Sequence, residues 1–84
     1  MREHPLVTYD PDADVVYVRL SNDVISHTTG LDDLRNIDYS AAGTVVGIEF
    51  ICASDGIDLA DIPFSHAVAE AIGSSGFDLP IFAS

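Results

Sequence analysis

The sequence is poor in positive charge. It contains no lysine and three arginines against 14 acidic residues, and its formal net charge is -11. A protein that binds a nucleic-acid backbone needs clustered Lys or Arg side chains to neutralise phosphates, so we expect no direct binding of DNA or RNA. An acidic surface instead attracts basic surfaces, which makes a basic protein the expected class of partner. Solubility alone is an alternative explanation of the same charge.

The sequence also has a single cysteine, Cys52, and no long apolar run. One cysteine cannot form an intrachain disulfide, and small secreted domains usually contain several, so a reducing compartment is favoured. The longest apolar stretches are far shorter than the roughly 20 residues of a membrane-spanning helix, and the N-terminus lacks the pattern of a signal peptide. We therefore expect a cytoplasmic protein that does not act at a membrane.

A length of 84 residues leaves room for one domain, residues 1–84, and a hydrophobic content of 48% is sufficient for a core. The pattern predicts an α+β fold in which an antiparallel β-meander sheet of four to five strands has one C-terminal helix packed on one face. The strands are expected at residues 6–9, 15–20, 24–29, 35–39 and 45–52. The third of these is the most polar, and we expect it near an edge, ended by Gly30.

Alternation within the two most apolar strands predicts which side chains form the core. One face is expected to carry Val16, Val18 and Leu20 from one strand, and Val46, Ile48, Phe50 and Cys52 from the other. The opposite face carries Val15, Tyr17, Val45 and Ile51, and is therefore only partly polar. It is expected to be covered by the C-terminal segment or by another subunit. Gly47 on that face indicates a close approach of another backbone or of a large side chain.

A helix of about ten residues is predicted by apolar side chains at intervals of four. Phe64, Val68 and Ile72 form this stripe. Asp61 is expected to cap the helix, Pro63 to lie in its first turn, and Gly73 to end it. Residues 77–84 form an apolar tail that either folds back or exchanges between subunits.

Asp10, Asp12 and Asp14 alternate in a way that is similar to the start of a calcium-binding loop. The glycine and the closing Glu of such a loop are replaced by Val15 and Ser21, so we interpret the segment as a hairpin turn, in which Asp side chains accept bonds from backbone N–H groups.

No metal site, cofactor or catalytic group is predicted elsewhere. His4, His27 and His66 have no spacing that places two of them on one helix face, and no cysteine pair accompanies them. His27 is interpreted as a polar residue of an edge strand and His66 as a helix residue facing solvent. Cys52 is interpreted as a small core residue, because a reactive thiolate needs nearby positive charge.

Several strand motifs resemble those of the YuzE-like family of small uncharacterised prokaryotic proteins. These motifs are residues 9–14, VVYVRL, IDY, Gly43 with VVGIEF, and Ala53-Ser54, so the resemblance covers residues 6–54. It implies a β-rich domain with a C-terminal helix and brings no established activity or catalytic residue. Some relatives are thought to be encoded beside toxin-like proteins, which implies an antitoxin-like role. An acidic residue tends to follow IDY in the family, and Ser40 stands there in this chain.

The sequence therefore favours a non-enzymatic interaction module, expected to act as a homodimer, whose acidic surface or apolar tail binds another protein. The alternative is a small-ligand or metal-dependent enzyme with a site at the turn from Asp10 to Asp14, assisted by His27 or Asp38. The two hypotheses differ in what the structure should contain. An enzyme needs these side chains to converge in a pocket, whereas a binding module leaves them separated.

Overall fold

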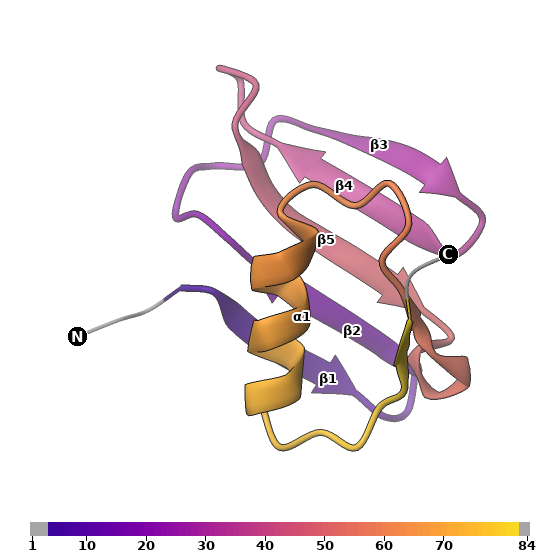
Figure 1. Cartoon of the computed structure of the whole chain (residues 1–84). Helices are drawn as coiled ribbons and strands as arrows, with labels where there is room; N and C mark the ends of the chain where they lie inside the picture. Colours follow the sequence, from indigo (N-terminus) through magenta and orange to yellow (C-terminus); the bar gives the residue numbers. More distant parts are fainter. Residues whose placement is uncertain (1–3, 83–84) are drawn as a thin grey trace.

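A computed structural model describes residues 4–82 and contains a five-stranded antiparallel sheet with one α-helix on one of its faces (Figure 1). The α+β prediction is confirmed. The elements follow the order β1 (Leu6–Asp10), β2 (Val15–Arg19), β3 (His27–Asp32), β4 (Arg35–Tyr39), β5 (Val45–Ile51), a 3-10 turn (Ala53–Asp55), β6 (Ile57–Asp58), α1 (Ser65–Ser74) and β7 (Ile81–Phe82). No helix within residues 4–82 has the length and apolarity to cross a membrane.

The strand order in the sheet is β1-β2-β5-β4-β3. A hairpin, β1 and β2, is followed by a meander of β3, β4 and β5, and the two parts join where β5 pairs with β2. The two most apolar strands thus lie in the middle of the sheet, where both of their edges are hydrogen-bonded and their inward side chains are fully covered. The weaker strands β1 and β3 form the two edges.

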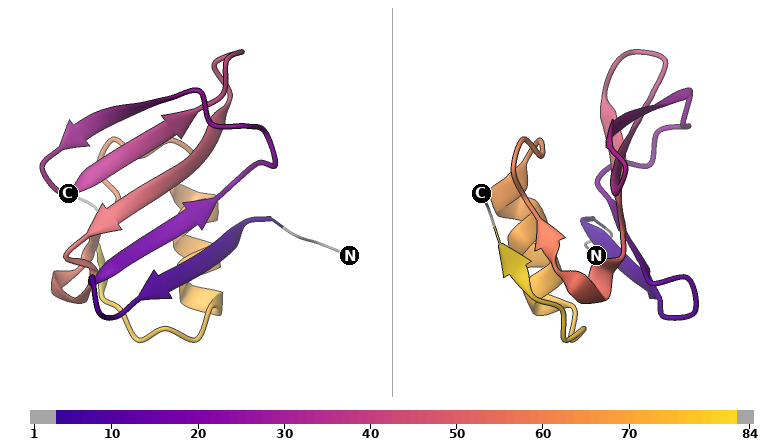
Figure 2. Two further views of the ribbon diagram at one scale, coloured as in Figure 1. Left: turned by 180° about the vertical axis from the view of Figure 1, so that it is seen from behind. Right: turned by 90° about the vertical axis from the view of Figure 1, so that its right-hand side faces the viewer.

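The core lies between the sheet and α1, on one side only. Val16, Val18, Ile48 and Phe50 are buried there, as the alternation predicted, and Val68 and Ile72 of the helix are fully buried against them. Burial of each such side chain contributes about 1.5–3 kcal/mol. Figure 2 shows that α1, β6 and β7 all lie on this side, and that no helix or strand within residues 4–82 covers the opposite face of the sheet.

The third strand begins and ends later than predicted. It was expected at residues 24–29 and is observed at His27–Asp32, with Gly30 inside it rather than beyond its end. Val24 is outside the strand and 84% exposed. The pairing with β4 shifts register between Gly30 and Asp32, and a bulge of this kind, which glycine favours, allows the strand to continue. Its position at an edge was predicted and is confirmed.

A second irregularity lies in β5 and changes the position of Val45. Asp38 pairs with Gly47, but the next residue, Tyr39, pairs with Val45, so one extra residue is accommodated in β5. A bulge interrupts strict alternation. Val45, predicted on the opposite face, packs against the core, and Val46, predicted on the core face, is fully buried. The strand also ends at Ile51, because Cys52 has a left-handed backbone (φ 57); the cysteine is half-buried and is not a core residue of the strand.

The helix begins after its predicted cap. Asp61 and Phe64 both have left-handed backbones (φ 61 and φ 56), which excludes them from a right-handed helix, and α1 starts at Ser65 without a side-chain cap. Pro63 precedes it. Phe64 was predicted in the buried stripe, but it is 66% exposed because it belongs to the connection and not to the helix.

The helix also ends one residue beyond Gly73, at Ser74. The Ser75 backbone N–H and hydroxyl both donate to the Ile72 carbonyl, and the left-handed residue that follows is Gly76 (φ 88). Within the described part of the apolar tail, Ile81 and Phe82 pair in parallel with Ile57 and Asp58 of the same chain. This part of the tail folds back; residues 83 and 84 lie outside the described range.

Candidate functional site

The open face of the sheet carries a tyrosine that lies across a glycine. Tyr17 of β2 faces Gly47 of β5, and a Cβ atom built at Gly47 would lie 2.0 Å from the Tyr17 hydroxyl oxygen and 2.3 Å from its Cζ atom. Only a residue without a side chain leaves room for the ring. The predicted close approach at Gly47 is therefore confirmed, and the approaching group is the Tyr17 side chain.

The Tyr17 hydroxyl reaches the next strand beyond Gly47. It donates a hydrogen bond of 2.7 Å to the Asp38 carboxylate of β4, which also accepts one from the Thr28 hydroxyl of β3. Burial, followed by the hydrogen bond to Asp38, raises the pKa of Tyr17 above its usual value, so the phenol remains a donor at neutral pH. A parallel bond of 2.7 Å joins the Asn36 amide to Glu49. The polar groups at the centre of this face thus bind one another across the strands.

The Asp10–Asp14 turn holds the hairpin together. The Asp10 carboxylate accepts bonds from the backbone N–H groups of Asp12 and Ala13, at 3.0 and 3.3 Å. Asp14, which has a left-handed backbone (φ 57), accepts bonds from the Tyr9 hydroxyl at 2.9 Å and from the Ser54 backbone and hydroxyl at 2.9 and 2.6 Å. The carboxylate of Asp14 therefore connects the first hairpin to the 3-10 turn after β5.

The electrostatics of this cluster match a structural role. Hydrogen bonds from Ser54 lower the pKa of Asp14, and the hydrogen bond to Asp14 raises the pKa of Tyr9. The carboxylate oxygens of Asp10 and Asp14 accept hydrogen bonds from different groups of the protein. Between residues 4 and 82, no three His, Cys, Asp or Glu side chains come together in a way that would hold a metal ion.

The histidines lie apart from this turn. His27 is exposed on edge strand β3, as predicted, and stacks on Tyr39 with ring centroids 5.3 Å apart. His66 is exposed on α1, as predicted, and its Nε2 atom lies 3.3 Å from Glu70 of the same helix. His4 is half-buried and precedes β1. Asp38, the carboxylate that the enzyme hypothesis adds to the Asp10–Asp14 turn, and Asp14 of that turn are held by different partners on different elements.

Arg35 has a role that the sequence did not reveal. It lies on the core side of β4 and is 8% exposed. Its Nε and Nη2 atoms donate to Asp32 at 3.0 and 2.7 Å, and Nη1 donates to the carbonyls of Asp58 and Ala60. The guanidinium therefore joins the sheet to the segment before α1, and it lowers the pKa of Asp32.

Comparison with known families agrees with the motifs. Residues 6–54, more than half of the chain, match the model described as a protein of unknown function, DUF2283. The chain belongs to DUF2283, the YuzE-like family. No curated protein and no solved structure matches the chain.

The DUF2283 segment ends at Ser54, the residue whose backbone and hydroxyl bind Asp14. It contains all five strands of the main sheet and stops before α1. The motif residues make the two clusters described above: Tyr17, Gly47 and Asp38 on the open face, and Tyr9 with Asp14 and Ser54 at the turn. Both clusters fix strands relative to one another, which gives these motif residues a structural explanation.

Ser40, at the position where the family tends to have an acidic residue, is buried. Its hydroxyl oxygen accepts a hydrogen bond of 3.1 Å from the Thr44 backbone N–H and so closes the turn between β4 and β5. In this chain the position therefore stabilises a turn.

Proposed function

We propose that this DUF2283 protein is a non-enzymatic interaction module that binds a basic protein through its acidic surface. The observation that carries the proposal is that both described arginines, Arg19 and Arg35, bind groups of their own chain. Arg35 is buried on Asp32 and two carbonyls, and Arg19 donates to the carbonyls of Ser21 and Asp23 at 2.8 and 3.0 Å. Many acids remain exposed, among them Asp10, Asp12, Asp23, Asp33, Asp55, Asp61, Glu70 and Asp78.

The consequence is a surface field of one sign. A net charge of -11 on a small protein speeds encounter with cationic partners within a Debye length of about 8 Å at physiological salt. The separation of the polar clusters supports a binding role over chemistry, since acid–base catalysis needs groups within hydrogen-bond reach of a shared substrate. Neutralisation of a small basic toxin, an antitoxin-like role, is a special case of this proposal.

The proposal includes a homodimer. The open face of the sheet carries Val15 and Ile51, both half-buried, and no segment between residues 4 and 82 covers it. An isologous dimer is the commonest way to cover such a face. Light scattering is expected to give about twice the monomer mass of 8.9 kDa at micromolar concentration. A mass that remains that of the monomer would remove the dimer from the proposal.

The partner is tested by affinity purification from the native cytoplasm. This compartment is chosen because a lone cysteine, Cys52, favours a reducing environment. The tagged chain is expected to retain a basic protein that mass spectrometry identifies, and the purified pair is expected to dissociate as salt rises. A variant with Asp33, Asp55 and Asp61 changed to Asn tests whether the negative charge of the surface is what retains the partner. Retention of neutral or acidic proteins only, or binding that salt does not weaken, would contradict the proposal.

A further inference from the structure

The two edges of the main sheet differ in how well they are protected against pairing with another strand. Edge strand β3 is interrupted by a register shift between Gly30 and Asp32. Edge strand β1 pairs with β2 over its full length, Leu6–Asp10, without a shift, and contains neither proline nor lysine. Among residues 4–82, no strand lies on the outer side of β1. Its outward backbone groups are therefore available to an added strand.

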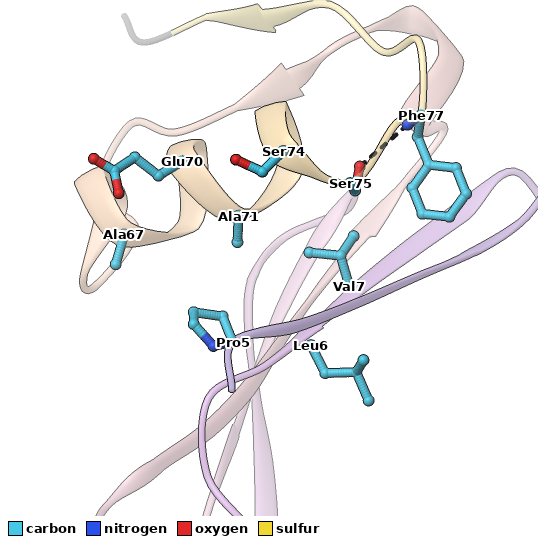
Figure 3. A pocket seen from close by; sticks show the side chains of 9 residues that line it. All are labelled: Pro5, Leu6, Val7, Ala67, Glu70, Ala71, Ser74, Ser75 and Phe77. Atoms are coloured by element: carbon cyan, nitrogen blue, oxygen red, sulfur yellow. Dashed lines mark hydrogen bonds between the residues drawn. The ribbon is translucent and has the colours of Figure 1, made fainter. Parts of the chain in front are cut away.

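A groove of about 490 Å³ runs between this edge and the helix (Figure 3). Pro5 and Val7 point from the strand side toward the helix, and Ala71 points from α1 toward them. The helix contributes small side chains here, which leaves depth for the side chains of another chain. Phe77, packed edge-on against Tyr9 with ring centroids 5.6 Å apart, also lines the groove.

We propose that β1 and this groove bind an extended segment of a basic protein, which adds to the sheet as a further strand. This inference rests on the proposed function and names its binding site. Backbone hydrogen bonds to β1 provide affinity in this mode, and pockets for alternate side chains provide specificity. Side chains of the added strand that face α1 would contact Val7 and Ala71, so residues of the size of valine fit there.

Charge favours a basic segment over a second copy of this chain. Glu70, which is 73% exposed, lines the groove, and its described ion-pair partner is the still more exposed His66. Asp10 ends β1, and Asp78 follows Phe77. Arg19 and Arg35 are both engaged elsewhere, whereas a second copy would bring another net charge of -11 to the same edge. The alternate side chains of the added strand, which point away from α1, are therefore expected to be Lys or Arg, because the summed field of these acids attracts them without direct contact with Glu70.

The experiment uses fluorescent peptides of defined sequence and the full-length chain. A seven-residue peptide of alternating lysine and valine is the probe. A peptide of alternating glutamate and valine tests charge, and a lysine–valine peptide with N-methylated alternate amides tests backbone pairing. Ala71→Leu fills the groove, and Ala69→Leu is its matched control, because both alanines are half-buried on α1 and Ala69 does not line the groove. Glu70→Lys tests charge at the groove, and its control is the double variant Ala41→Lys/Ala42→Lys, which changes the net charge by the same amount at exposed positions that do not line the groove.

We expect the lysine–valine peptide to bind, and the other two peptides to bind at least about tenfold more weakly. Ala71→Leu and Glu70→Lys should each weaken binding by a similar factor, while their controls change it less than about twofold, with unchanged circular dichroism spectra. Equal binding by all variants would overturn the groove as the site.

If the basic protein from the cell still binds Ala71→Leu normally, the proposed function stands and this inference fails; if no basic protein or peptide binds, both fail. A loss of dimer mass in Ala71→Leu would assign the groove to a second copy and also overturn the inference.

Discussion

Replacement of Gly47 by alanine tests how the open face is built. The added Cβ would lie 2.0 Å from the Tyr17 hydroxyl oxygen, far inside an ordinary contact distance of 3.4–4 Å. Because Gly47 itself is paired with Arg19 of β2 and with Asp38 of β4, the ring of Tyr17 must move instead of the strand. Movement of the ring breaks its 2.7 Å hydrogen bond to Asp38.

The expected cost follows from two contributions. Overpacking costs about 1–3 kcal/mol, and loss of a hydrogen bond on a half-exposed face costs about 1 kcal/mol. Alanine offsets about 0.5–1 kcal/mol of this, because it loses less backbone entropy than glycine on folding. We therefore expect Gly47→Ala to lower the free energy of unfolding by about 1–3.5 kcal/mol, a large fraction of the stability of a small domain.

Urea unfolding followed by circular dichroism measures this free energy, and a double-mutant cycle isolates its cause. In a Tyr17→Ala background the obstructing ring is absent, and Gly47→Ala should become stabilising by about 0.5–1 kcal/mol. The sign of the effect thus changes with the background. An equal cost of Gly47→Ala in both backgrounds would refute the assignment of Tyr17 as the group that lies over Gly47.

Four further variants test other contacts by the same unfolding measurements. Asp14→Asn should lower the urea midpoint at pH 7. Because the folded-state pKa of Asp14 is lowered, its ionised form stabilises the fold above about pH 4, and this contribution disappears as the pH falls through the folded-state pKa. The stability of the variant should therefore depend less on pH in the acid range. An unchanged profile would contradict the role of Asp14. Arg35→Lys should cost about 2–3 kcal/mol, since an ammonium cannot make the same set of bonds, and a cost under about 0.5 kcal/mol would contradict it. Ile72→Ala should cost about 3 kcal/mol and Phe64→Ala less than about 0.5 kcal/mol; equal costs would contradict the observed start of the helix.

The elements that the sequence predicted correctly are those with a clear local period. Val16, Val18, Ile48 and Phe50 alternate in two strands and all face the helix, because a strand without irregularity turns each second side chain to the same side. The predicted stripe held for the last turns of α1, where Ile72 is fully buried.

The errors occur where one residue departs from the regular backbone. The bulge at Val45 and Val46 depends on how β4 and β5 fit together, which no local pattern specifies. The left-handed backbones of Asp61 and Phe64 delay the helix, although side-chain pattern and capping residues favoured an earlier start. Neither residue is glycine, so nothing in the composition marked these positions.

The residues of the candidate site also divide into those that the sequence indicated and those that depend on contacts between distant segments. The sequence indicated that Gly47 has a close neighbour, because glycine in an apolar strand needs a reason, but it did not identify Tyr17. The role of Arg35 depends on carbonyl groups of residues 58 and 60, and contacts so distant along the chain leave no sequence spacing to recognise. The groove beside β1 joins residues near position 6 to residues near position 71 and was likewise invisible in the sequence.

Heteronuclear NMR of the isotope-labelled chain, titrated with the lysine–valine peptide, measures most directly whether this acidic domain recognises a basic strand at one edge. We expect amide shift changes concentrated in Leu6–Asp10 and Ser65–Ser74, and smaller changes when salt is raised. Changes centred on β3 or on the open face around Tyr17, or an unchanged spectrum at millimolar peptide, would contradict it.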